Sequence, residues 1–259
     1  MILGAVLLIL IVVGLFAISY RGALHEFQIL QKDYNSQNKW QEFLSEQLPL
    51  VIRNLPPTWL GNWSASRTEN KDWQVTISIK EGRKTRKLQT SFKEWLEYPE
   101  KQIENGTELG HNAKLDITVQ NWFRRWFWIP TNSPRSHILS GHEDNSCLPL
   151  RKTTADSTVI VSTDGAPIEI WISHEAGIPS PIVDEIRGKN PWIQSTNEIP
   201  GVEEVKFIEV VLRPGNAIVI PTHWWYSIRS TDDSALSWFW INEFHSPISW
   251  LATTIQNKN

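Results

Sequence analysis

Cysteine is nearly absent from this chain of 259 residues, which contains a single one, Cys147. One thiol cannot close an internal disulfide, so the sequence excludes both a disulfide-stapled scaffold and a cysteine-based zinc site. Positive charge is sparse as well, since the net charge is −3 and the lysines and arginines are scattered along the chain. We therefore expect no nucleic-acid partner, because binding to phosphate backbones needs a basic surface.

Tryptophan, in contrast, is abundant. The chain has 15 tryptophans, and hydrophobic residues make up 41% of it against 20% for charged residues. Most of the tryptophans stand in apolar runs typical of strands, which indicates that flat rings fill the core of a sheet. The other interpretation is a surface on which aromatic rings stack against sugars or bases.

The first part of the chain, MILGAVLLILIVVGLFAISY, has no charged side chain. At about 1.5 Å per residue, a helix of this length crosses the hydrocarbon layer of a bilayer. A cleaved signal peptide normally has a basic start, which this run lacks, although Ala17 and Ser19 are small enough to precede a cleavage site. We predict an uncleaved transmembrane anchor over residues 1–20 and a single-pass integral membrane protein.

The charges that follow the apolar run bear on its orientation. Arg21, Lys32 and Lys39 come after it and nothing basic precedes it, which favours the cytosolic side for the large domain. Asn62 and Asn105 begin the triplets N-W-S and N-G-T, which match the glycosylation sequon. They are candidate glycosylation sites if the domain lies on the other side of the membrane.

Patterns of apolar residues divide the rest of the chain. Leu24, Phe27, Leu30 and Tyr34 fall near helical spacing, which predicts a stalk helix or linker over residues 21–36. Residues 37–259 are predicted to form one domain. Its first part is expected to contain helices at 39–49 and 91–98, the second with a capping box of Ser91 and Glu94, and strands at 50–55 and 73–79.

From Leu115 onward, short apolar segments follow one another, separated by glycine, proline, asparagine and aspartate. We predict strands at 115–123, 157–163, 167–173, 205–212, 216–221, 224–229 and 235–241, and a closing helix at 245–255. This many short strands with close turns favours a sandwich or a barrel.

The segment LRPGNAIVIPTHWWYSI, residues 212–228, resembles the penultimate hairpin of the JmjC-like, cupin-type 2-oxoglutarate oxygenases. In that family a Pro-Gly turn leads into an apolar strand, a proline, a short corner, an aromatic pair and a metal-binding histidine. Weaker likeness covers roughly residues 37–250, in WQEFLSEQLPLVIRNLP, SFKEWLEY and SALSWFWIN. The resemblance implies a mainly β fold with flanking helices, a double-stranded β-helix, with iron held by two histidines and one carboxylate.

The chain departs from the family at the positions that would bind iron. Tyr226 stands where the final histidine is expected. With Gly165 taken as the glycine that ends the next strand, the family's His-x-Asp pair falls on Lys152 and Thr154. An ammonium group cannot bind a cation without losing its proton, and a hydroxyl is a poor substitute for a carboxylate.

The positions that would grip 2-oxoglutarate differ in the same way. Pro167 takes the place of a common lysine, and Thr158 that of a polar amide. We therefore expect a domain without iron or 2-oxoglutarate, which acts as a binding or structural module for an unknown protein or small-molecule ligand. Fold resemblance alone does not decide function, because function depends on the site.

Two other functions remain open. An active Fe(II)/2-oxoglutarate oxygenase would use His142 and Asp144 as its His-x-Asp, with His223 or a Tyr226 phenolate as third ligand. The surrounding LSGHEDNSC is typical of a polar turn, and His223 is interpreted as a solvated corner residue. A carbohydrate-binding lumenal module would instead show glycosylated sequons and a row of exposed tryptophans.

Strand alternation assigns the aromatic residues of the hairpin to two faces. Trp224 and Tyr226 are predicted to point inside the barrel, and Trp225 to pack against covering helices. A buried phenol needs a hydrogen-bond partner, and Lys152 or Thr154 is the predicted one.

Overall fold

The computed structural model describes residues 7–14, 27–57, 74–81, 84–91, 93–94, 103–105, 137–140, 146–153, 157–192, 199, 201–230 and 235–241. The predicted strand at 115–123 and the predicted helix at 245–255 lie outside these residues.

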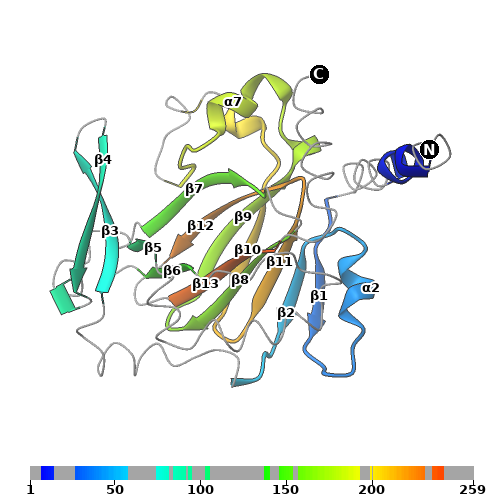
Figure 1. Ribbon diagram of the computed structural model, residues 1–259, viewed down its shortest axis with the longest axis horizontal. Coiled ribbons are helices and arrows are strands. Elements are labelled where there is room, and N and C mark those ends of the chain that lie inside the picture. Colours follow the sequence, from blue (N-terminus) through cyan, green and yellow to red (C-terminus); the bar gives the residue numbers. More distant parts are fainter. Residues whose placement is uncertain are drawn as a thin grey trace.

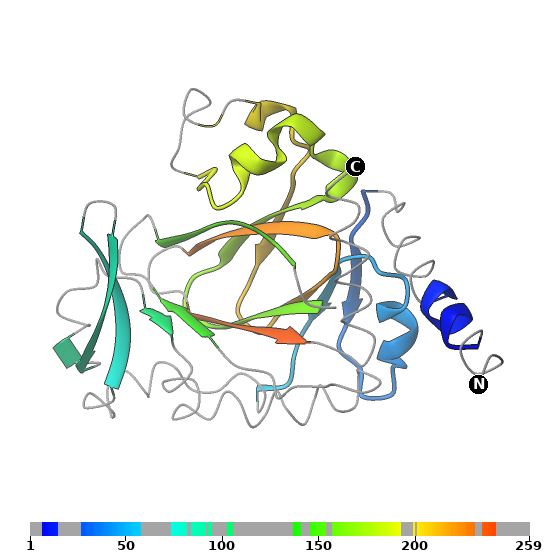
Figure 2. The ribbon, with the colours of Figure 1, turned by 45° about the horizontal axis from the view of Figure 1, so that its top comes forward.

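The described part is mainly β, with few helices and two facing sheets in which antiparallel pairing dominates (Figures 1 and 2). The larger sheet has six strands, in the order β1 (Leu30–Asp33), β2 (Leu50–Arg53), β11 (Ala217–Pro221), β8 (Ser157–Asp164), β13 (Ala235–Ile241) and β6 (His137–Ser140). The smaller sheet has four, in the order β10 (Ile208–Leu212), β9 (Ile168–His174), β12 (Trp224–Ser230) and β7 (Ser146–Lys152). A three-stranded sheet of β4 (Lys84–Ser91), β3 (Gln74–Glu81) and β5 (Ile103–Asn105) lies to one side.

The main core lies between the two facing sheets. Strand alternation divides β11 in the expected way, because Ile218 and Ile220 point into this core while Ala217 and Val219 pack on the opposite face. The smaller sheet contributes apolar side chains from all four of its strands, Leu148, Ile168, Ile170, Ile172, Val210, Leu212, Trp224, Tyr226 and Ile228. We call this cluster the inter-sheet core.

Short helices cover the outer faces of both sheets. The helix α2 (Trp40–Leu44) buries Trp40 against the larger sheet. Over the smaller sheet lie the 3-10 helices η3 (Glu175–Gly177), η4 (Ser180–Ile182) and η5 (Val202–Glu204) and the helix α7 (Val183–Ile186). Trp225 packs beneath this cover with Leu150 and Ile186, so the predicted split of the aromatic residues between two faces is confirmed.

Several predicted elements are confirmed. Strands form within or close to the predicted ranges at β2, β3, β8, β9, β10, β11, β12 and β13, and α2 lies inside the predicted helix at 39–49. The capping box is present as well: the Ser91 Oγ accepts from the backbone N–H of Glu94 at 3.1 Å, and Glu94 accepts from the N–H of Ser91 at 3.2 Å. Gly165, which follows β8, has a φ of 81°, a left-handed conformation suited to glycine.

The predicted stalk helix over 21–36 is wrong for its described residues. Residues Leu30–Asp33 form β1, which pairs in parallel with β2. The spacing of Leu30 and Tyr34 by four residues fits a strand as well as a helix, because four is a multiple of the strand period of two. Pairing with β2 decides between them, and both side chains pack on the face of the larger sheet that α2 covers.

Residues 7–14 form a short helix beyond β1 and α2, at the opposite end of the molecule from β3 and β4 (Figures 1 and 2). No helix within the described ranges is both long and apolar enough to cross a membrane. The other residues of the predicted anchor, 1–6 and 15–20, lie outside those ranges.

Candidate functional site

The chain turns a sharp corner between the two sheets at Thr222 and His223. The strand β11 ends at Pro221 in the larger sheet, and β12 begins at Trp224 in the smaller one. His223 has a φ of 69° and is fully buried. A left-handed conformation costs a residue with a side chain about 1–2 kcal/mol, so the corner needs neighbours that hold it in place.

Glu175 is the neighbour that holds this corner. It follows β9 directly and begins η3. Its backbone N–H donates to the carbonyl oxygen of His223 at 2.9 Å, and its Oε2 lies 3.2 Å from the His223 Nδ1. The interpretation of His223 as a solvated residue is therefore wrong, because the imidazole is buried against a carboxylate.

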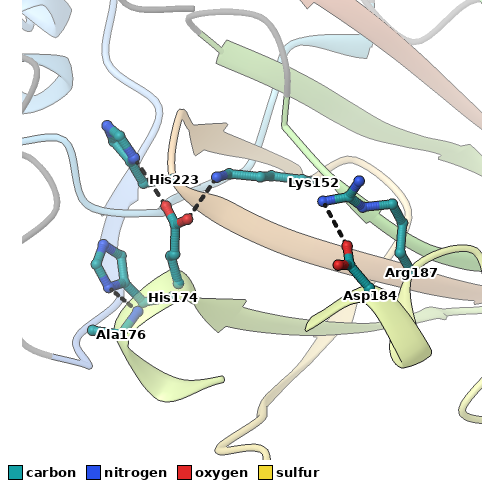
Figure 3. A network of polar contacts seen from close by, with 7 residues as sticks. Lys152, His174, Ala176, Asp184, Arg187 and His223 are labelled. Carbon is teal, nitrogen blue, oxygen red and sulfur yellow. Dashed lines mark hydrogen bonds and ion pairs between the residues drawn. The ribbon is translucent and has the colours of Figure 1, made fainter. Parts of the chain in front are cut away.

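The second oxygen of Glu175 binds Lys152. The Lys152 Nζ, at the end of β7, lies 2.8 Å from the Glu175 Oε1. The Lys152 side chain is 8% exposed and that of Glu175 22%. In Figure 3, the dashed lines from Lys152 and His223 converge on this carboxylate. We call Lys152, Glu175 and His223 the polar clamp, because it joins β7, the end of β9 and the β11–β12 corner.

Burial and charge act in opposite directions on the two ionisable partners. Burial alone would raise the pKa of Glu175, but the hydrogen bond with His223 and the nearby Lys152 ammonium outweigh it and hold this pKa below its ordinary value. Burial lowers the pKa of Lys152, and the Glu175 carboxylate counteracts part of that effect. An ionised Glu175 is thus the group that makes a buried lysine tolerable.

The lowered pKa of Glu175 predicts acid lability. A carboxylate whose pKa is lower in the folded chain stabilises the fold at pH values above its ordinary pKa of 4.5, and this contribution is lost as the pH falls through the folded pKa. We expect the urea midpoint to fall between about pH 7 and about pH 3, and the Glu175→Gln variant to show a smaller fall. If the urea midpoint fell equally with pH in the unaltered chain and in the Glu175→Gln variant, this assignment would be contradicted.

Tyr226 and Lys152 do not meet. Tyr226 is buried in the inter-sheet core, whereas Lys152 lies directly opposite Trp225, which faces the outer cover. Residues opposite each other on paired strands share a face, so the exposed residue on Tyr226's face is Arg151. The prediction that Lys152 supplies the partner of the phenol is wrong, because the two side chains start on opposite faces of the smaller sheet. Thr154 lies outside the described residues.

Thr158 and Pro167, the two positions that the resemblance assigns to 2-oxoglutarate binding, differ in their burial. Thr158 is fully buried on the same face of β8 as Ile160, towards the inter-sheet core. Its hydroxyl makes no hydrogen bond with any other described residue. Pro167 is exposed in the turn before β9. A threonine between apolar neighbours and an exposed proline offer no cation for a dicarboxylate.

The residues of the alternative site are only partly described. His142 and Asp144 lie outside the described ranges, as does Asn62. Asn105 ends β5, where its backbone alone is described. His223, the proposed third ligand, turns its Nδ1 to Glu175. Nowhere in the described ranges do three or more histidine, cysteine, aspartate or glutamate side chains gather as a metal site would require.

Iron does not fit the two mapped ligand positions that are described. Lys152 carries a positive charge that Glu175 neutralises, and Tyr226 is surrounded by apolar side chains of both sheets. A facial triad needs lone pairs from imidazole and carboxylate groups directed at one point. These two side chains start on opposite faces of the smaller sheet, so they cannot share a metal ion.

Sequence reasoning missed Glu175. The signal that could have found it is a His-Glu pair directly after the apolar run IEIWIS, since a carboxylate next to a buried strand needs a partner. His174, which sequence analysis left unassigned, ends β9 and caps η3, because its Nδ1 accepts from the Ala176 N–H at 3.2 Å (Figure 3). The tryptophan-rich core is confirmed for Trp40, Trp224 and Trp225, which are all buried.

The chain was compared with models of known protein families and with curated proteins. Neither comparison finds a match.

Proposed function

We propose that the chain is a membrane-anchored, cupin/JmjC-like domain that acts as a binding or structural module without iron or 2-oxoglutarate chemistry. The observation that carries this proposal is the polar clamp. Lys152 occupies the position where the resemblance places an iron-binding histidine. Its Nζ forms an ion pair with the Glu175 Oε1 at 2.8 Å. The clamp joins β7, the end of β9 and the β11–β12 corner through side chains of the chain itself.

The strand arrangement supports the family's fold. The penultimate hairpin of the resemblance corresponds to β11 and β12, which lie in different sheets and meet at the Thr222–His223 corner. From β6 to β13 every connection passes from one sheet to the other except that from β9 to β10, which lie in the same sheet, and this alternation is typical of a double-sheet jelly roll. Tyr226 then occupies the inter-sheet core at the point where the family binds its metal.

The helix of residues 7–14 supports the membrane anchor. Its apolar side chains from Leu7 to Val13 are 39–64% exposed, on every side of the helix. A helix that is apolar all round is stable where an apolar environment surrounds it, and no layer formed by the described residues covers this one. A bilayer around residues 1–20 would provide that environment, with the large domain on the cytosolic side.

Turnover tests the proposal against an active oxygenase. Purified full-length chain incubated with Fe(II), oxygen and 2-oxoglutarate is expected to form no more succinate than a protein-free control. Succinate formation that disappears in His142→Ala and in Asp144→Ala would establish the oxygenase instead. Glu42→Ala, at an exposed position of α2, is the control variant that should leave either result unchanged.

A further inference from the structure

Phe27 fills a recess at the end of the inter-sheet core. Its ring lies edge-on to the rings of His174 and Trp224, with centroid distances of 6.4 and 6.1 Å. Gly177 forms another wall, and a Cβ on this residue would overlap the Phe27 ring. The ring therefore occupies space that exists only because residue 177 has no side chain.

The walls of this recess are more firmly placed than its occupant. His174 and Trp224 are fully buried and opposite each other on the paired strands β9 and β12, and their ring centroids are 5.1 Å apart. Phe27 is only partly buried, and the pairing of its segment with β2 begins three residues later, at Leu30. His174 and Trp224 are fixed by the strand pairing of the smaller sheet, whereas the Phe27 ring is held by side-chain contacts.

We propose that this recess is a binding site for a small, single-ring aromatic molecule and that Phe27 occupies it in cis as a displaceable competitor. Buried, largely apolar walls of single-ring size favour a flat aromatic ring. The inference deepens the binding role proposed above and names a ligand class for it. It also places the site beside the polar clamp, since His174 precedes Glu175 and Trp224 follows His223.

The position of Phe27 links the recess to the proposed anchor. Residues 21–26 separate residues 1–20 from Phe27, and a fully extended chain of that length reaches about 20 Å. An anchor in the bilayer would therefore hold Phe27 close to the membrane surface.

Binding of 4-fluorophenol, followed by ¹⁹F NMR on full-length chain in lipid nanodiscs, tests the proposal. The Phe27→Ala variant is expected to bind this probe at least about tenfold more tightly than the unaltered chain, because the competitor is removed from the site. Adding Gly177→Ala to Phe27→Ala should abolish the gain, since the new Cβ fills the recess. Partition of the probe into lipid is the same for all these chains and cancels.

Phe43→Ala is the matched control. Phe43 is also partly buried, 6.0 Å from the ring of Trp40, but on the outer face of the larger sheet. Its removal should leave probe binding as in the unaltered chain. The proposal is overturned if Phe27→Ala gains no affinity or if Phe43→Ala gains as much.

Hydrogen exchange provides a second measurement if Phe27→Ala folds poorly. In Gly177→Ala the ring cannot stay in the recess, so amide exchange around residues 27–29 should accelerate about tenfold or more while β9 and β12 stay protected. Unchanged exchange around these residues would contradict the close approach. Neither measurement uses iron or 2-oxoglutarate, so its failure is distinct from failure of the turnover test.

Discussion

Replacing Glu175 by alanine is expected to lower the free energy of unfolding by about 3 kcal/mol. The substitution leaves the Lys152 ammonium, on a side chain that is 8% exposed, without its carboxylate, and it also releases His223 at the strained corner. Removing one partner of a buried ion pair costs more than removing both. Urea unfolding of the full-length chain at neutral pH measures the change.

Two companion variants show whether burial is the cause. In the double variant Lys152→Met with Glu175→Gln, no buried charge is left without a partner, so we expect a smaller loss than in Glu175→Ala. Glu42→Ala breaks the exposed pair with Lys39, whose side chains are 68% and 79% exposed, and should change stability by at most about 0.5 kcal/mol. If Glu175→Ala behaved like Glu42→Ala, the polar clamp would contribute nothing to the fold.

A chain that begins at Arg21 is expected to move from the membrane pellet to the soluble fraction. Residues 1–20 contain no charged side chain, and the described helix within them exposes its apolar side chains. Ultracentrifugation after carbonate extraction measures the partition.

A single charge in the same helix gives a finer test. Leu10 is 63% exposed, and Leu10→Lys places a charge near the middle of the proposed span, at a cost of about 3 kcal/mol. We expect Leu10→Lys to reduce the membrane-bound fraction and Leu10→Ala to leave it unchanged. Full-length chain that remains soluble, or a shortened chain that stays in the pellet, would contradict the anchor.

The strands of the sandwich were predictable because their pattern is local. Alternation places Ile218 and Ile220 on one face of β11, and the same rule places Trp224 and Tyr226 on one face of β12. The strand β1 (Leu30–Asp33) could not be predicted in this way, because the spacing of its apolar residues suits both a helix and a strand. Only the partner strand β2, which is distant in sequence, removes the ambiguity.

The candidate site shows where a single sequence stops being informative. Alternation along β12 is enough to place Tyr226 in the core. The face on which Lys152 lies depends instead on the register of β7 with β12. The β7–β12 ladder contains a bulge between Tyr226 and Ile228, which shifts that register. The burial of Glu175 could not be predicted either, because it depends on contacts with Lys152 and His223, which are distant in sequence.

The role of Gly177 also could not be predicted from the sequence. Nothing in its local sequence indicates that a phenylalanine from residue 27 presses on it, and the close approach becomes visible only when the chain is folded. Residues that act through long-range contacts are therefore the ones that sequence patterns miss.

The unfolding midpoint of the full-length chain, measured with chelator and then with Fe(II) and 2-oxoglutarate, tests the central claim most directly. A ligand that binds the folded chain raises the midpoint, by about 2.7 kcal/mol of stability at a hundredfold excess over its dissociation constant. If the polar clamp stands in place of a metal site, the two midpoints will be the same. A midpoint that rises with Fe(II), and no longer does so in His142→Ala, would contradict the account.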